Sequence, residues 1–178
     1  MSSTLLNAKD ISRAINRISH EILERNNGAE SIALVGIRTR GVVLSHRLKE
    51  KIESIENLTI NHGTLDITLY RDDLAEGIQK PELRKTEIFF TLENKHIILC
   101  DDVLFTGRTI RAAIDALMDF GRPSSVQLAV LIDRGHRELP IRPDYVGKNF
   151  PTAKSKRVQV LLDEEDGEDK VIIQEQSK

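Results

Sequence analysis

The segment 97–109, Ile-Ile-Leu-Cys-Asp-Asp-Val-Leu-Phe-Thr-Gly-Arg-Thr, constrains the fold of this chain more than any other. Four apolar residues precede Asp101 and Asp102, and a turn containing Gly107 follows them. This order predicts a buried strand that carries two carboxylates at its carboxyl end. An amphipathic stretch comes next, so we expect a helix whose amino end is suited to holding a phosphate group.

Strand-like and helical segments alternate along the whole chain. Strands are predicted over 31–37, 63–69, 96–102, 126–132, 157–162 and 170–173. Helical spacing of apolar residues follows a capping pair formed by Asn7 and Asp10, and it recurs over 42–52 and 110–118. The alternation predicts one α/β domain, residues 1–178, with an open, mainly parallel, twisted sheet flanked by helices. Without the segment 97–109, any doubly wound nucleotide-binding domain would fit equally well.

The composition is typical of a soluble cytoplasmic protein. Apolar residues make up 39% of the chain, and none of its apolar runs approaches the length of a membrane span. The amino-terminal residues lack the basic and apolar regions of a secretory signal. The single cysteine, Cys100, lies within an apolar segment, so we expect an inert buried thiol.

The net charge of −2 hides an uneven distribution along the chain. Residues 134–157 contain seven lysines and arginines against two acids, whereas residues 163–178 contain seven acids against two lysines. The basic segment permits an anionic partner, although a solvated surface is the commoner reason for such a balance.

The segment 97–109 closely resembles the signature with which type I phosphoribosyltransferases bind phosphoribosyl pyrophosphate (PRPP). The resemblance implies that Asp101 and Asp102 bind the ribose hydroxyls and favour positive charge on the sugar. It also implies that the following turn wraps the 5-phosphate. Substrate-binding residues implied here are Asp101, Asp102, Val103, Leu104, Phe105, Thr106, Gly107, Arg108 and Thr109. Helix capping or metal ligation in another α/β protein is the alternative explanation of the paired acids.

Two more segments are implied to bind pyrophosphate. The loop 38–41 matches the family's pyrophosphate loop, which often contains a non-proline cis peptide, and this assigns Thr39 and Arg40 to substrate binding. The polar stretch 70–87 matches the family's catalytic loop, so Arg71 and Arg84 join Asp101 and Asp102 as catalytic candidates, with Arg84 also binding substrate. An ordinary glycine turn and a solvated loop are the alternatives. Mg²⁺ is expected to be held mainly by PRPP oxygens, with no metal ligands from the protein.

The remaining motifs resemble one branch of this family, the bacterial pyrimidine operon regulatory proteins that are also uracil phosphoribosyltransferases. These motifs are residues 66–73, 121–125, 133–140 and 147–149. The resemblance implies a small C-terminal hood and the conversion of uracil and PRPP to UMP and pyrophosphate. Arg134 and the main chain of Val158 are implied to approach uracil, although Arg134 could instead pair with a carboxylate. Phe105 replaces the aspartate of the hypoxanthine and guanine enzymes, which disfavours a purine phosphoribosyltransferase.

Proteins of the same branch bind the leader of pyrimidine operon mRNA. UMP promotes this binding, and transcription attenuation follows. RNA contacts implied by the resemblance are Asn16, Arg17, His20, Arg25, His136, Arg137, Arg142 and Lys148. A modest basic patch would need a second copy beside it, so we expect a homodimer or a higher homo-oligomer. A regulator that senses UMP with negligible turnover is the alternative from a different functional class.

Overall fold

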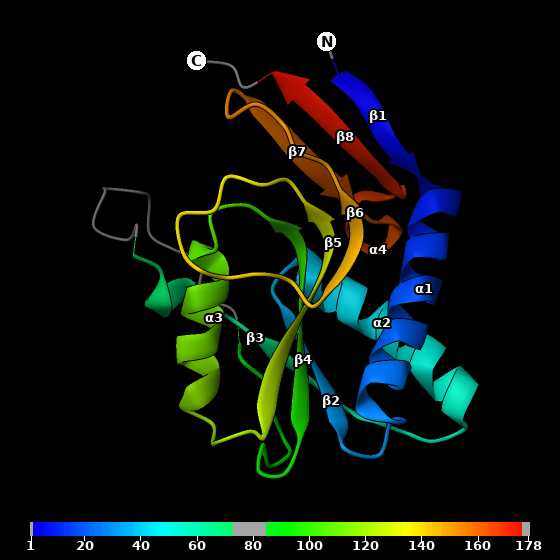
Figure 1. The fold of residues 1–178 in the computed structure, drawn as a ribbon, viewed down its shortest axis with the longest axis vertical. Coiled ribbons are helices and arrows are strands. Elements are labelled where there is room, and N and C mark those ends of the chain that lie inside the picture. Colours follow the sequence, from blue (N-terminus) through cyan, green and yellow to red (C-terminus); the bar gives the residue numbers. More distant parts are fainter. Residues whose placement is uncertain (1, 73–84, 176–178) are drawn as a thin grey trace.

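The computed structural model describes residues 2–72 and 85–175, which form two β-sheets (Figure 1). The larger sheet is parallel throughout, with the strand order β3-β2-β4-β5-β6. Its strands are β2 (Ile32–Ile37), β3 (Asn61–Leu65), β4 (His96–Leu104), β5 (Ser125–Asp133) and β6 (Tyr145–Asn149). The predicted open, parallel α/β sheet is therefore confirmed.

Helices cover both faces of this sheet. The helices α1 (Ala8–Asn26) and α2 (Arg40–Glu56) lie on one face, and α3 (Arg108–Met118) lies on the other (Figure 1). Side chains of β4 alternate between the two cores, with Ile98 and Cys100 facing α1 and α2, and Ile97 and Leu99 facing α3. A strand buried on both faces explains why this segment is apolar throughout. Cys100 is fully buried, and burial raises the pKa of its thiol, as expected for an inert cysteine.

The second sheet, which we call the hood, is built from both ends of the chain. Its antiparallel strands are β1 (Ser2–Asn7), β8 (Lys170–Glu175) and β7 (Lys156–Leu161), in that order, and α4 (Asp163–Asp166) connects β7 to β8. The C-terminal strands were predicted, but β1 was not. Its first residues are polar and exposed, and it is a strand because it pairs with β8.

Two other strands differ from the prediction in where they end, and one further strand was not predicted. The strand predicted over 63–69 ends at Leu65, and a 3₁₀ turn, η1 (Thr68–Tyr70), follows it. Asp66 starts this turn by accepting hydrogen bonds from the Thr68 amide and hydroxyl. The strand β4 continues two residues beyond Asp102, and the unpredicted strand β6 forms the edge of the sheet.

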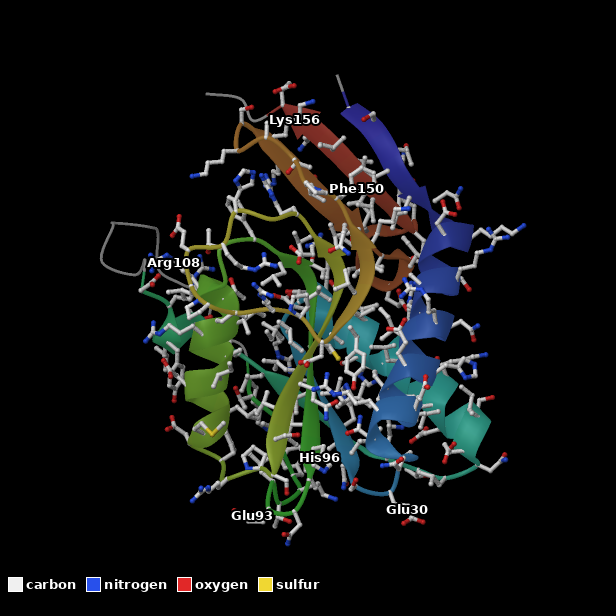
Figure 2. All side chains as sticks on the ribbon, in the orientation of Figure 1. Glu30, Glu93, His96, Arg108, Phe150 and Lys156 are labelled. Atoms are coloured by element: carbon white, nitrogen blue, oxygen red, sulfur yellow. The ribbon has the colours of Figure 1, made fainter. Side chains whose placement is uncertain are left out.

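The carboxyl ends of the central strands face the hood. Arg108 and Phe150 lie at this end of the molecule, whereas Glu93 and His96 lie at the opposite end of the sheet (Figure 2). In α/β folds the carboxyl ends of parallel strands are the usual place for ligands. Among the described helices, none is long and apolar enough to cross a membrane.

Candidate active site

The two candidate carboxylates are oriented by the main chain at the end of β4. The amide of Asp102 donates to Asp101 Oδ1 over 2.9 Å, and the amide of Val103 donates to Asp102 Oδ1 over 2.8 Å. Asp101 is buried, with 8% of its surface exposed, while Asp102 is half-buried. Each side chain is therefore held in place before a ligand arrives.

Burial also sets the ionisation of this pair. It raises the pKa of both carboxyls, and the neighbouring charge of Asp102 raises the pKa of Asp101 further. The guanidinium of Arg40 acts in the opposite direction on the pKa of Asp102. Hydroxyl groups, such as those of a sugar, are suitable hydrogen-bond donors to two desolvated carboxyls.

The turn after β4 has the geometry of an anion-binding loop. Gly107 adopts a left-handed conformation with φ +96°, which a residue with a side chain rarely adopts. The helix α3 begins at Arg108, so its unpaired first amides and its dipole point into this turn. A cavity of about 200 Å³ lies here, lined by Arg71, Asp72, Thr106, Arg108 and Thr109.

Arg108 ties the turn to two other segments. Its Nη1 lies 2.6 Å from Asp72, and its Nε lies 2.8 Å from Glu138. The carbonyl of Thr106 accepts hydrogen bonds from the amides of Glu138 and Leu139. The motif at 133–140, for which the sequence indicated no structural role, therefore stabilises the turn through these hydrogen bonds.

The second candidate loop, residues 38–41, lies against the acidic end of β4. The peptide bond between Arg38 and Thr39 is cis. The half-buried Thr39 immediately precedes α2, and Arg40 begins the helix. A Cβ atom on Gly41 would lie only 2.5 Å from the carbonyl oxygen of Cys100 and 3.2 Å from the Cα of Asp101. Because residue 41 is a glycine, the start of α2 packs directly against the main chain of β4 at Cys100 and Asp101.

A cluster of buried polar groups lies beside Phe105. The guanidinium carbon of Arg134 is 4.1 Å from the centre of the Phe105 ring, and Arg134 Nη2 donates to the carbonyl of Ala153 over 3.2 Å. Arg134 is 6% exposed, yet its Nε has no hydrogen-bond partner within the described chain. The hydroxyl of Thr152, whose amide donates to the Arg134 carbonyl, is also buried and unpartnered among these residues. Unpaired buried donors of this kind call for a ligand or an ordered water.

The alternative interpretation of Arg134 as a carboxylate partner finds no support here. Burial lowers the pKa of Arg134, and no acidic group in the described part of the chain counters it. Val158 contributes its side chain to the core with 7% exposure, so only its main chain is available. β7 is an edge strand of the hood, which leaves one of its main-chain edges without a strand partner among the described residues.

The other predicted substrate residues occupy three kinds of position. Leu104 is a core side chain whose carbonyl accepts the amide of Arg134, and Val103 is half-buried beside the core. Arg71 lines the phosphate cavity. Arg84 lies outside the described residues.

The predicted RNA contacts gather mainly around β6, the edge strand. Arg17 and Lys148 line a hollow of about 350 Å³ between α1 and β6. A neighbouring hollow of about 460 Å³ is lined in part by His136, Arg137 and Arg142. Asn16 instead lines a groove between α1 and α2, while His20 is exposed on α1 and Arg25 pairs with Asp144 at 2.5 Å.

Arg17 and Arg137, like Arg25, also have internal partners. Arg17 donates to the carbonyl of Gly147 over 2.6 Å, which joins α1 to β6. Arg137 donates to the carbonyls of Phe105 and Ile141 and pairs with Asp133. The guanidinium of Arg137 therefore helps to fix the main chain at Phe105, a role that the sequence did not indicate.

Several residues around the site were missed by the sequence analysis. Glu138 stood in a motif without an assigned role, and Thr152 and Asp166 stood in segments noted only for their positive and negative charge, respectively. Glu138 and Asp166 bind Arg108 and Arg40, which are distant in sequence, and only the fold brings Thr152 close to Arg134. No short-range signal was available to find them.

Comparisons with known proteins agree with this geometry. A family model described as a phosphoribosyl transferase domain matches residues 1–165. A Deinococcus radiodurans protein named bifunctional protein PyrR is 57% identical over 167 residues, covering 94% of this chain and 91% of that protein. A protein of the same name from Clostridioides difficile is 56% identical over 171 residues, covering 96% of this chain and 97% of that protein.

Solved structures support the fold. The hypoxanthine phosphoribosyltransferase of Trypanosoma cruzi matches with a TM-score of 0.73 over 98% of this chain and 97% of that chain, at 17% identity. A hypoxanthine phosphoribosyltransferase from Staphylococcus aureus matches with a TM-score of 0.65 over 85% of this chain and 79% of that chain, at 21% identity. At such identities the likeness concerns architecture alone, and it confirms the predicted phosphoribosyltransferase fold.

Proposed function

Because this chain belongs to the PyrR family of phosphoribosyltransferases, we propose that it is both an enzyme and a regulator. As an enzyme it transfers the phosphoribosyl group of PRPP to uracil, giving UMP and pyrophosphate. As a regulator it binds the leader of pyrimidine operon mRNA in response to UMP and causes transcription attenuation. One observation carries the enzymatic proposal: the paired carboxylates at the end of β4 are followed directly by the phosphate turn, and Phe105 between them lies beside the buried guanidinium of Arg134.

Each part of PRPP has a matching partner in this arrangement. Asp101 and Asp102 accept hydrogen bonds from the ribose hydroxyls, and the amides and hydroxyls of residues 106–109 hold the 5-phosphate. The loop at Thr39 and Arg40 binds the pyrophosphate, together with Arg71. Uracil lies near Phe105, where the Nε of Arg134 supplies a hydrogen-bond donor and the Thr152 hydroxyl supplies a second polar group.

The chemistry follows from this positioning. The N1 atom of uracil attacks the anomeric carbon as the bond to pyrophosphate breaks, and positive charge develops on the sugar. The N1 proton passes to the departing pyrophosphate. Negative charge on Asp102, which the nearby Arg40 favours, stabilises that developing charge. Because the reactants are held in line, their translational entropy is lost on binding and does not add to the activation barrier.

We also propose that Mg²⁺ accompanies PRPP. The described residues contain no group of three or more histidine, cysteine or acidic side chains suited to hold a metal ion. The ion is held mainly by oxygen atoms of PRPP, as is usual for this hard cation beside phosphate groups. When bound, the ion supplies charge compensation on the leaving pyrophosphate.

The regulatory role draws on the basic residues around β6. Arg17, Lys148 and Arg142 line adjoining hollows on both sides of this edge strand, so an RNA backbone lying across it meets several cations. We propose that a homodimer presents two such surfaces to the leader RNA. Residues 1–178 act as one domain in this scheme, and the mRNA partner makes the cytoplasm its place of action.

The proposal is tested by two assays on the same preparation. Conversion of labelled uracil to UMP should depend on both PRPP and Mg²⁺, and hypoxanthine or guanine should not compete. Titration of pyrimidine leader RNA should show binding that UMP strengthens and that salt weakens. Absence of turnover with any pyrimidine would contradict the enzymatic role, and equal binding to unrelated hairpins would contradict the regulatory role.

A further inference from the structure

The acidic segment that follows β7 is bound to arginines of α2. Asp166, in α4, pairs with Arg40 through two hydrogen bonds, one from Nε over 3.0 Å and one from Nη2 over 2.6 Å. The Asp166 carboxylate also accepts a hydrogen bond from the amide of Leu162 over 2.8 Å, which fixes its orientation. The side chain of Asp166 is only 15% exposed and that of Arg40 only 32% exposed, so this pair is partly shielded from water.

The geometry of this pair leaves one edge of the guanidinium available. The carboxylate binds the edge of the guanidinium formed by Nε and Nη2, so the two hydrogens of Nη1 remain available as donors. No hydrogen bond of Arg40 Nη1 to another described residue is present. The same guanidinium is close enough to Asp102 for its charge to lower that carboxyl's pKa. Arg40, at the start of α2, is thus bound by Asp166 and is also close to the acidic end of β4.

We propose that Asp166 is a positioning residue that holds Arg40 ready to bind the pyrophosphate of PRPP. The inference rests on the proposed function of the loop 38–41 and adds to it a residue from the hood. An arginine already clamped by a carboxylate loses little side-chain freedom when it binds a phosphate, so affinity rises without a further contact. The clamp also makes the pyrophosphate site depend on the C-terminal strands, which are far from it in sequence.

A neighbouring pair provides an internal comparison. Arg47, two turns further along α2, is bound by Glu164 and by Asp169, with contacts of 2.5 to 2.8 Å. These contacts fasten the same acidic segment to the same helix, but Arg47 belongs to no loop of the candidate site. Removing an acid from Arg47 should therefore cost stability alone, whereas removing Asp166 should also change the handling of pyrophosphate.

The test compares Asp166→Asn with the matched control Asp169→Asn. The amide in Asp166→Asn keeps the shape of the side chain and one oxygen for the Leu162 amide, but it cannot clamp Arg40 as a charged pair. We expect the KM for PRPP and the Kd of PRPP measured by calorimetry to rise by up to about tenfold, the cost of ordering one free arginine side chain on binding. The Kd of UMP, which has no pyrophosphate, should stay unchanged. Asp169→Asn should lower Tm without raising either PRPP constant.

A second variant keeps the test decisive if Asp166→Asn folds poorly. Arg40→Lys keeps the positive charge but loses the planar fork that Asp166 grips. It should weaken PRPP binding, and the double variant should be no weaker than the worse single variant because the two residues act together. The inference is overturned if Asp169→Asn weakens PRPP as much as Asp166→Asn does, or if UMP binding falls in parallel. Since PRPP binding is measured directly, this result stands apart from whether uracil is the base transferred.

Discussion

Gly41 lies in contact with the main chain of Cys100, so that the amino end of α2 and the acidic end of β4 touch with no side chain between them. A Cβ atom on Gly41 would lie 2.5 Å from the Cys100 carbonyl oxygen. The loop proposed to bind pyrophosphate and the carboxylates proposed to bind ribose are therefore one rigid unit. Their spacing is set by main-chain packing.

The first prediction concerns this contact. In Gly41→Ala the added methyl group collides with main-chain atoms of β4, which cannot rotate away, so the loop 38–41 must move. We expect the KM for PRPP to rise and the free energy of unfolding to fall by about 1–3 kcal/mol, as for other overpacked sites. Initial-rate kinetics and urea denaturation measure the two effects. Wild-type values in both would show that the loops are not packed as described.

The second prediction concerns the cost of burying Asp101. Its pKa is raised in the folded protein, so above the usual carboxyl range the folded state binds more protons than the unfolded state, and stability falls as pH rises. Asp101→Asn removes this penalty. The variant should be more stable than the wild type near pH 7, and the difference should disappear near pH 4. Thermal unfolding followed by circular dichroism across this range provides the measurement.

The same variant should lose activity. The amide cannot supply the negative charge or the acceptor geometry of the carboxylate, so kcat should fall about a hundredfold, as for loss of other preorganised electrostatic groups. A gain in stability together with a loss of turnover is the signature of a functional residue that is costly to the fold. An Asp101→Asn protein that is less stable at neutral pH would contradict the burial argument.

The third prediction concerns the proposed uracil site around Phe105, Arg134 and Thr152. Thr152→Val keeps the shape of the side chain but removes a buried hydroxyl that has no partner within the described chain. If that hydroxyl binds uracil, the KM for uracil should rise about tenfold with no change in the KM for PRPP. Ser155→Ala, at an exposed position of the same loop, is the control. A change in Tm with both KM values unaltered would assign the hydroxyl to packing or to a buried water.

The fourth prediction concerns RNA. Arg142 is exposed beside β6, so Arg142→Ala should weaken leader RNA binding and make the dependence of log K on log salt less steep by about one unit. Arg122→Ala removes an equally exposed cation from the opposite end of the sheet, just before β5. Filter binding at several salt concentrations compares the two. Equal losses would mean that general charge, and not the surface around β6, governs RNA affinity.

The central strands and helices were predictable because their signals are local. The capping pair of Asn7 and Asp10 starts α1 as expected, and the apolar run before Asp101 forms the buried strand β4. The strand β1 could not be predicted, since its polar first residues form a strand only by pairing with β8 at the other end of the chain. The strand predicted over 63–69 ends early, at Leu65, because the side chain of Asp66 accepts hydrogen bonds that start a turn.

The candidate site divides in the same way. Paired acids and a glycine turn are visible in sequence because strand, turn and helix follow one another along the chain. The clamp between Arg40 and Asp166 joins residues separated by 126 positions, and the segment that contains Asp166 suggested only an acidic surface. Likewise, the sequence marked Arg137 as an RNA contact, while the fold also uses its guanidinium to hold the Phe105 carbonyl.

A crystal structure of the wild-type protein with UMP tests the central claim most directly. The ribose hydroxyls should lie within hydrogen-bond distance of the Asp101 and Asp102 carboxylates, with the phosphate on the amides of residues 106–109 and the base beside Phe105 and Arg134. UMP bound elsewhere, or with its ribose hydroxyls turned toward solvent, would contradict the account.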